Sequence, residues 1–349
     1  MRCSVAMSTY NGAAYLAEQL DSIFAQTRPV DEIVISDDGS TDQTLAILED
    51  YRKNHPEICW TVLPAEKNQG FRASFRRALT HCSGDLILLC DQDDRWTKEK
   101  AAKIEAIFEK NPKVQALVTD FKTIDAKGRF LNPEAKTENL WVSDRVLRSG
   151  EKPAQITLRE MLGRNQGQGC AMALRREIAE AYLSLGTVWT HDWILNLIAA
   201  MRGGLYYCDE QLIHYRLHGA NVIGMAQGEH AQRKVGLVRR AYEYALAFKY
   251  SFLEGDGKAA RESLLSVTMD KLELVFSRLA CGDAERSQWE TWRAFQDKRL
   301  ALIEKKKPFS YLLFWLTHRE LFAENAYFST TEQRAIRLML DLCAMLKKQ

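Results

Sequence analysis

Asp85-Leu86-Ile87-Leu88-Leu89-Cys90 is followed directly by Asp91-Gln92-Asp93-Asp94. The first six residues predict a buried strand, because strands in parallel sheets are nearly continuous in apolar side chains. The three carboxylates that follow repel one another, so a compensating charge is expected beside them. A divalent cation held together with a substrate diphosphate supplies such a charge, since hard cations bind carboxylate and phosphate oxygens. A solvated acidic turn is the alternative interpretation.

The first third of the chain alternates predicted strands with predicted helices. This repetition predicts an α/β fold with a Rossmann-like, mostly parallel sheet and flanking helices. Such sheets bind ligands beyond the carboxyl ends of their strands, where the polar turns at 9–12, 37–40 and 91–94 are expected. Strands are predicted at 3–8, 32–36, 59–63, 85–90, 114–119, 205–208 and 212–216, and helices at 13–26, 41–53, 74–82, 97–109, 176–184 and 191–201.

The character of the sequence changes at about residue 229. Residues 121–165 are less regular than the rest of the first part, whereas the chain beyond 229 has long amphipathic helical patterns with few Pro or Gly. We therefore predict an α/β domain at 1–228 and a helical C-terminal domain at 229–349.

Two polar segments end the first two predicted strands. Ser8-Thr9-Tyr10-Asn11-Gly12 contains an Asn-Gly turn before a helix, where backbone amides suit an anionic ligand. Ser36-Asp37-Asp38-Gly39-Ser40-Thr41-Asp42 places an acidic pair at the sheet edge, where it can accept hydrogen bonds from a base or a ribose. Each segment taken alone is also compatible with an ordinary turn.

Together with Asn68-Gln69-Gly70 and the acidic cluster, these segments resemble the family 2 glycosyltransferases, which have the GT-A fold. Two later segments, Trp189-Thr190-His191-Asp192-Trp193 and the stretch 215–224, resemble the rhamnosyltransferase-like branch that builds bacterial surface polysaccharides. The resemblance covers about residues 3–224. His191 departs from it, because many members carry Glu at that position.

The resemblance implies a role for each matching residue. It implies that Asp192 is the general base and that Asp37 contacts the pyrimidine ring of the donor. It implies an Mg²⁺ or Mn²⁺ ion bound by Asp93, Asp91 and His218. The nucleotide sugar is expected to contact Thr9, Tyr10, Asn11, Asp37, Asn68, Asp91 and Gln92.

The implied activity is inverting, metal-dependent transfer of a sugar, with rhamnose favoured, from a dTDP- or UDP-sugar. The implied acceptor is a glycan or a lipid-linked molecule in polysaccharide biosynthesis of the cell envelope. We expect a non-processive enzyme, because Gln92-Asp93-Asp94-Arg95-Trp96 matches the signature of processive synthases only where it overlaps the metal motif. A catalytically inactive nucleotide-sugar or glycan-binding relative and a sugar nucleotidyltransferase are the alternatives.

Charge and cysteine usage restrict the function classes. The net charge is only +2, and basic residues are not clustered with aromatic ones, so nucleic-acid binding is not expected. The eight cysteines are scattered singly, which favours free thiols in a reducing compartment. Without a signal-peptide pattern at the start, the sequence predicts a cytoplasmic protein.

A basic and aromatic stretch in the tail has two interpretations. Lys305-Lys306-Lys307-Pro308-Phe309 leads into Tyr311, Leu312, Phe314, Trp315 and Leu316. Lysines beside aromatic residues are typical of peripheral contact with the inner face of the cell membrane. The favoured interpretation is that Leu312, Trp315 and Leu316 pack against other tail helices or a second subunit, as in a homodimer through the C-terminal helices.

Overall fold

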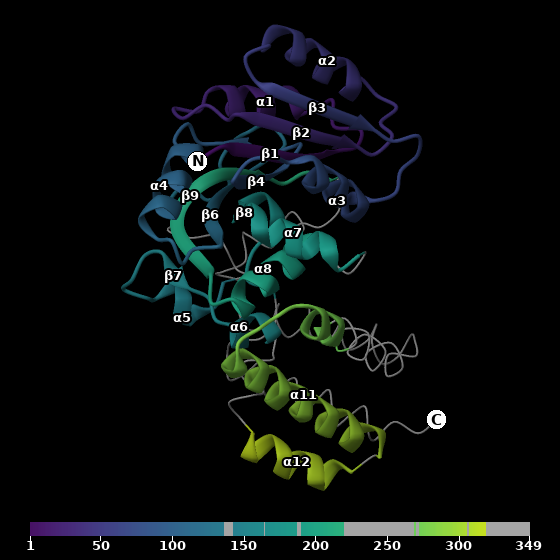
Figure 1. Ribbon diagram of the computed structural model, residues 1–349, viewed down its shortest axis with the longest axis vertical. Coiled ribbons are helices and arrows are strands. Elements are labelled where there is room, and N and C mark those ends of the chain that lie inside the picture. The colour runs from purple at the N-terminus through teal and green to yellow at the C-terminus, as the bar shows by residue number, and fades with distance from the viewer. Residues whose placement is uncertain are drawn as a thin grey trace. The chain divides into compact units, whose positions relative to one another are not determined.

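The computed structural model describes residues 1–135, 142–163, 165–186, 190–219, 269, 272–305 and 307–318 (Figure 1). The strands are β1 (Cys3–Thr9), β2 (Glu32–Asp37), β3 (Cys59–Pro64), β4 (Leu86–Asp91), β5 (Arg95–Trp96), β6 (Ala116–Ile124), β7 (Ala154–Gln155), β8 (Met172–Arg175) and β9 (Leu205–Arg216). The helices are α1 (Leu16–Phe24), α2 (Thr44–Asn54), α3 (Phe71–His81), α4 (Lys100–Lys110), α5 (Asp144–Leu147), α6 (Leu158–Gly163), α7 (Arg176–Ser184), α8 (His191–Met201), α11 (Asp283–Glu304) and α12 (Pro308–Thr317).

By its internal contacts, the chain divides into two compact units, Met1–Thr157 with Asn165–His230 and Leu158–Arg164 with Ala231–Gln349. The predicted boundary between residues 228 and 229 lies outside the described residues, as do Trp189 and the segment 220–224. That boundary therefore stays a prediction.

The nine strands form one sheet in the order β3-β2-β1-β4-β8-β6-β9-β5, and β7 also pairs with β9. The pairs β1–β2, β1–β4, β2–β3 and β6–β9 are parallel. The four pairs that involve β5, β7 or β8 are antiparallel. The predicted α/β class with flanking helices is confirmed, and the sheet is mixed because β8 runs antiparallel between β4 and β6.

The burial of the central strands explains why the apolar run Leu86–Cys90 correctly predicted a strand. β1, β2 and β4 are buried along nearly their whole length, because helices cover both faces of this part of the sheet. Helices α1, α2 and α4 contribute to one core cluster with side chains such as Val5, Ile33 and Leu88. Helix α3 contacts β1, β2, α7 and α8.

Several short elements differ from the sequence-based expectation. The strands expected at 205–208 and 212–216 are one continuous strand, β9, whose pairing with β6 has register shifts around Asp120. Strands β5, β7 and β8 and helices α5 and α6 were not predicted, because their two to six residues are too few to show a periodic pattern.

The sheet register brings the polar turns to one edge. Thr9 on β1 lies opposite Asp37 on β2, and Ser8 lies opposite Asp91 on β4. Carboxyl ends of parallel neighbours necessarily meet on the same side of a sheet, so the turns that follow them form one surface.

In the second unit, α12 lies beside α11 (Figure 1). Phe295 of α11 stacks on Phe314 of α12 with ring centroids 5.2 Å apart. On α11, Trp289 stacks on Phe276 of the preceding segment at 4.7 Å. Among the helices described, none has the length and apolarity needed to cross a bilayer.

Candidate active site

Asp37 closes the turn after β2. Its carboxylate accepts hydrogen bonds from Thr9 Oγ1 at 2.8 Å, Ser40 Oγ at 2.6 Å and the Ser40 amide at 2.9 Å. The amide of Gly39, whose φ of +83° favours glycine, adds a fourth at 3.2 Å. The Asp37 side chain is fully buried by these partners. The expected contact with a pyrimidine ring stays a prediction.

Gln92 joins the first polar turn to the acidic one. The Tyr10 amide donates to Gln92 Oε1 at 2.8 Å, and Gln92 Nε2 donates to the Tyr10 carbonyl at 3.0 Å. A Cβ at Gly12 would lie 2.1 Å from Gln92 Oε1, so glycine is needed for this close approach. Tyr10 itself remains exposed. Asn11 Oδ1 accepts from the Thr41 amide at 2.8 Å and thereby ties the turn to β2.

Asp38 is a residue whose role the sequence analysis did not separate from that of Asp37. Its two carboxylate oxygens accept hydrogen bonds from the amides of Gln69 at 2.9 Å and Gly70 at 2.7 Å. Asn68 Oδ1 also accepts from the Gly70 amide, at 3.0 Å. Asp38 thus holds the Asn68-Gln69-Gly70 segment beside the sheet edge. The second acid of the Asp-Asp-Gly motif was the sequence signal that could have indicated this separate role for Asp38.

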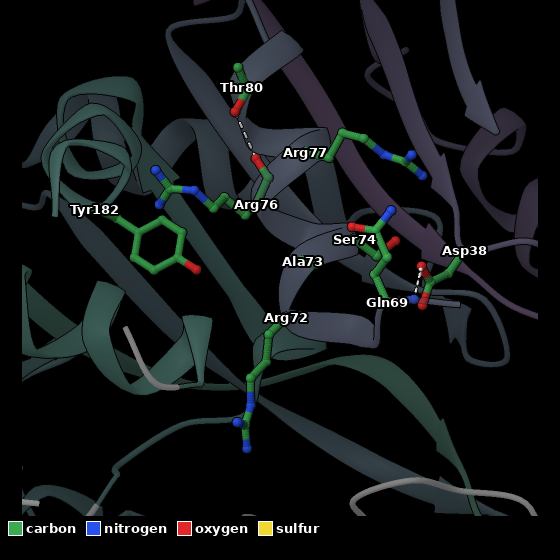
Figure 2. Close-up of a pocket in the computed structure, with 9 residues that line it drawn as sticks. All are labelled: Asp38, Gln69, Arg72, Ala73, Ser74, Arg76, Arg77, Thr80 and Tyr182. Atoms are coloured by element: carbon green, nitrogen blue, oxygen red, sulfur yellow. Dashed lines mark hydrogen bonds between the residues drawn. The ribbon is translucent and has the colours of Figure 1, made fainter. Parts of the chain in front are cut away.

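A cavity of about 300 Å³ adjoins this segment (Figure 2). Arg77 Nε and Nη2 donate to Ser36 Oγ and to the Asp37 and Leu63 carbonyls. Arg76 donates to the Leu183 carbonyl in the last turn of α7 and to the Gly186 carbonyl after it. Figure 2 shows the guanidinium groups of Arg72, Arg76 and Arg77 pointing in three different directions. They do not converge on one anion. The cavity is lined by Asp38, Gln69, Arg72, Ala73, Ser74, Arg76, Arg77, Thr80 and Tyr182.

The acidic cluster is compressed at the end of β4. Burial, and then repulsion from Asp93 and Asp192, raises the pKa of Asp91 to about 7. Asp94 is almost fully buried, and its Oδ1 accepts from the Arg216 amide at 2.9 Å. Because Asp192 acts on Asp91, the predicted general base and the acidic motif occupy the same part of the sheet edge.

Lys100 and Cys170 lie behind this cluster, where the sequence analysis expected no functional group. Lys100 is fully buried, its Nζ donates to the Cys170 carbonyl at 3.2 Å, and it lies 3.8 Å above the Trp96 ring. Burial lowers the pKa of Lys100 to about 8. The Cys170 sulfur and one oxygen each of Asp91 and Asp94 lie within 4.8 Å of one another. Lys100 carries no sequence signal, since a lysine in a helix usually faces solvent.

Asp93 and His218 meet although they are 125 residues apart. His218 Nε2 lies 2.8 Å from Asp93 Oδ2, and the imidazole packs on the Tyr15 ring at 4.8 Å. Carboxylate oxygens and an imidazole nitrogen suit Mg²⁺ or Mn²⁺. The crowding that disfavours ionisation of Asp91 is a further sign that a cation fits this donor set. Asp93 and His218 thus lie together, whereas the Asp91 carboxylate groups with Asp94 and Cys170 among the described residues, so a metal site made of Asp91, Asp93 and His218 stays a prediction.

Arg216 holds the backbone of the acidic motif through a hydrogen bond to the Asp93 carbonyl. It is buried, its Nε donates to the Asp93 carbonyl at 2.7 Å, and its guanidinium forms an ion pair with the Glu18 carboxylate.

Replacement of Arg216 should destabilise the protein. Hydrogen bonds to charged groups contribute about 1.5–3 kcal/mol each, so Arg216→Met is expected to lower the free energy of unfolding by at least about 1.5 kcal/mol. Urea denaturation measures this. Arg129→Met, which removes an exposed pair, is the control and should change stability by less than about 1 kcal/mol. Equal losses in both variants would contradict this role.

Asp192 lies in the first turn of α8, where hydrogen bonds and the helix dipole hold its carboxylate. Asn165 Nδ2 donates to Asp192 Oδ2 at 3.0 Å, and Asn196 Nδ2 in turn donates to Asn165 Oδ1 at 3.0 Å. The positive end of the helix dipole favours a carboxylate in this first turn. The two asparagines are functional candidates that the sequence analysis did not identify, because a single Asn between motifs carries no pattern.

His191 is packed away from solvent beside this base. Its ring stacks on Phe75 with centroids 4.0 Å apart, and the side chain is 5% exposed. Burial lowers the pKa of His191, so the imidazole is held neutral. This chain therefore presents an uncharged ring at the position before Asp192.

The pKa of Asp91 predicts how the metal-free site responds to pH. The folded protein holds the Asp91 proton up to about pH 7, whereas the unfolded chain releases it near the ordinary pKa of an aspartate, 3.8. Asp91 therefore lowers folding stability as pH rises from about 4 to about 7. A proton that competes with a cation should make Mn²⁺ affinity rise by up to about tenfold per pH unit below pH 7 and level off above it. Calorimetric titrations from pH 6 to 8 measure this, and a constant affinity would contradict it.

Comparisons with known proteins can now be read against this geometry. A family model for glycosyl transferase family 2 matches residues 4–183, more than half of the 349 residues. The chain belongs to glycosyl transferase family 2. The predicted family and enzyme class, a glycosyltransferase, are thereby confirmed.

Two curated relatives in this family align with the same part of the chain. An uncharacterized glycosyltransferase of Nostoc sp. is 28% identical over 63% of this chain and 66% of its own length. The dTDP-rhamnosyl transferase RfbG of Shigella flexneri is 28% identical over 68% of this chain and 80% of its own length. The chain thus spans slightly less than two thirds of the Nostoc protein.

A solved structure supports the fold of the family member. The crystal structure of S. aureus TarS 1-349 in complex with UDP-GlcNAc is 20% identical, with a TM-score of 0.51 over 96% of this chain and 90% of that one. At this identity the likeness is one of fold. It agrees with the mixed sheet and the GT-A fold that the motifs predict.

Proposed function

We propose that this family 2 member is an inverting, metal-dependent, non-processive glycosyltransferase that uses a nucleoside-diphosphate sugar. One observation carries the proposal: Asp192, from the first turn of α8, and Asp91, from the end of β4, flank the same turn. A Cβ at Gly169 would lie 3.8 Å from Asp192 Cβ, and the Cys170 sulfur lies within 4.8 Å of an Asp91 carboxylate oxygen. A base and a diphosphate site must adjoin if a hydroxyl is to attack the anomeric carbon between them. Asp192 and Asp93 then have separate roles.

Asp192 would take the proton of the acceptor hydroxyl as that oxygen attacks the anomeric carbon, and the diphosphate would leave from the opposite side. Asn165 orients the carboxylate by its hydrogen bond at 3.0 Å. Asp93, Asp91 and His218 would hold Mg²⁺ or Mn²⁺, whose Lewis acidity would neutralise charge on the departing diphosphate. One base with no covalent nucleophile is consistent with inversion.

The donor and acceptor are also proposals. A dTDP-sugar is favoured, with rhamnose as the sugar, since the relative from Shigella flexneri is named a dTDP-rhamnosyl transferase; a UDP-sugar is the second choice. Thr9, Tyr10, Asn11, Asp37, Asn68 and Gln92 belong to the turns proposed to receive the nucleotide. The proposed acceptor is a glycan or lipid-linked molecule of a bacterial surface polysaccharide. A homodimer through the C-terminal helices and a cytoplasmic location remain predictions.

A donor-turnover assay without acceptor tests the proposed reaction class. The full chain is incubated with dTDP-, UDP- and GDP-sugars and Mn²⁺, and slow release of a nucleoside diphosphate from one donor class is expected. Asp192→Asn should abolish this release, whereas Asp50→Asn, on the exposed face of α2, should not. Release of pyrophosphate would indicate a nucleotidyltransferase. Donor binding without release of nucleoside diphosphate from any of the donors would indicate an inactive binding protein.

A further inference from the structure

Helix α12 presents an apolar face to solvent. Phe309 is 88% exposed, Leu313 64%, Leu316 42% and Leu312 38%. These residues recur at helical spacing and share one side of the helix. Every large apolar residue that is exposed in the described part of the second unit belongs to this group. Soluble surfaces seldom gather such residues without a partner for them.

The opposite face of α12 is held firmly. Tyr311 is fully buried and accepts a hydrogen bond from Arg299 Nε at 3.3 Å, and Phe314 stacks on Phe295 of α11. Tyr311 and Phe314 pack on this side, whereas Leu312 and Leu316, which were expected to pack together with Trp315, are exposed; packing of these residues against a second subunit stays a prediction. The exposed face is consequently a separate surface of a helix that is already anchored.

Charge is confined to the two ends of this helix. The ten residues of α12 include no acidic or basic side chain. Lys305 and Lys307 are exposed directly before it, Lys306 lies between them in the sequence, and Arg319 follows shortly after its end. Arg319 is followed by Glu320, so the net positive flank is the lysine cluster before the helix. An uncharged apolar helix beside such a cluster matches an anionic lipid surface, where acyl chains receive the apolar face and headgroups receive the lysines.

We propose that α12 is an interfacial helix that binds an anionic lipid surface through Phe309, Leu312, Leu313 and Leu316. Ten residues span about 15 Å, half the roughly 30 Å of a bilayer core, so the helix lies in the interface rather than crossing it. A second copy of the chain fits this surface less well, since a stable interface uses about 20–30 residues a side. The proposal does not depend on the sugar, the base or the metal assigned above.

Vesicle co-sedimentation of the full chain tests the proposal. The parent protein is expected to bind vesicles of mixed phosphatidylglycerol and phosphatidylcholine at low salt, and to bind pure phosphatidylcholine vesicles at least about tenfold more weakly. The double variant Phe309→Ser, Leu313→Ser should lose at least about tenfold in binding while its thermal midpoint and donor turnover stay unchanged. Leu45→Ser, at an exposed leucine on α2, is the matched control and should bind like the parent.

Two further measurements complete the test. Lys305→Ala with Lys307→Ala should weaken binding to anionic vesicles and reduce its dependence on salt. No binding of the parent to anionic vesicles, or equal binding of the double variant, would overturn the proposal. Sedimentation velocity identifies the other occupant: a dimer that the double variant dissociates, without vesicle binding, would assign this face to a second copy.

Discussion

Replacement of Asp192 by Asn is expected to lower kcat by about 10²–10⁴-fold, the range associated with the loss of a general base. The amide keeps the shape of the side chain and can still contact Asn165, but it cannot accept the proton of an attacking hydroxyl. Donor affinity should change little, because the base faces the acceptor. Steady-state kinetics with varied donor, and calorimetric titration of the donor, separate the two quantities.

Protein stability provides the control for this variant. Asp192 repels Asp91, so its neutral replacement should leave the metal-free thermal midpoint at pH 8 unchanged or raise it. Asn165→Ala should lower kcat less than Asp192→Asn, since it removes only the hydrogen bond that orients the base. A weakened donor affinity with an intact kcat in Asp192→Asn would show that Asp192 is a pocket residue rather than the base.

Asp93→Asn is expected to abolish metal-dependent turnover. A neutral amide oxygen is a much weaker ligand for a hard cation than a carboxylate, and the diphosphate would then leave without charge compensation. The fold should survive, because the Arg216 guanidinium bonds the Asp93 backbone carbonyl rather than its side chain. Isothermal titration calorimetry, with Mn²⁺ titrated into the nucleotide-bound protein, measures the loss of metal affinity directly.

Chelation should reproduce the effect of this substitution. EDTA is expected to stop turnover of the parent, and excess Mn²⁺ to restore it, whereas no metal concentration should restore Asp93→Asn fully. His218→Ala should have a smaller effect on Mn²⁺ affinity than Asp93→Asn, since it removes a neutral ligand. Full activity of Asp93→Asn, or activity indifferent to EDTA, would remove Asp93 from the metal site.

The polar turns at one sheet edge could be predicted because each has a signal in its own local sequence. Leu86–Cys90 is continuously apolar, and the turns after β1, β2 and β4 contain Asn, Asp and Gly at the points where the apolar runs stop. Parallel neighbours then align their ends without further information. The mixed character of the sheet was not readable, because β8 is short and its direction depends on the chain path between β4 and β6.

The residues that support the site were the least predictable part. Lys100 reads as an ordinary helix residue, yet it is fully buried against Cys170, 70 positions away. The pairing of Asn165 with Asp192 likewise joins α8 to the loop after α6. Such contacts are set by tertiary packing, so no local pattern in the sequence announces them.

The anomeric configuration of the released or transferred sugar tests the central proposal most directly. Proton NMR, recorded during turnover and before mutarotation is complete, reports whether the product has the configuration of the donor or the opposite one. A single displacement assisted by Asp192 predicts the inverted anomer in the parent protein and no detectable product from Asp192→Asn. A first-formed product with the configuration of the donor would contradict the single-displacement mechanism and the role of Asp192 in it.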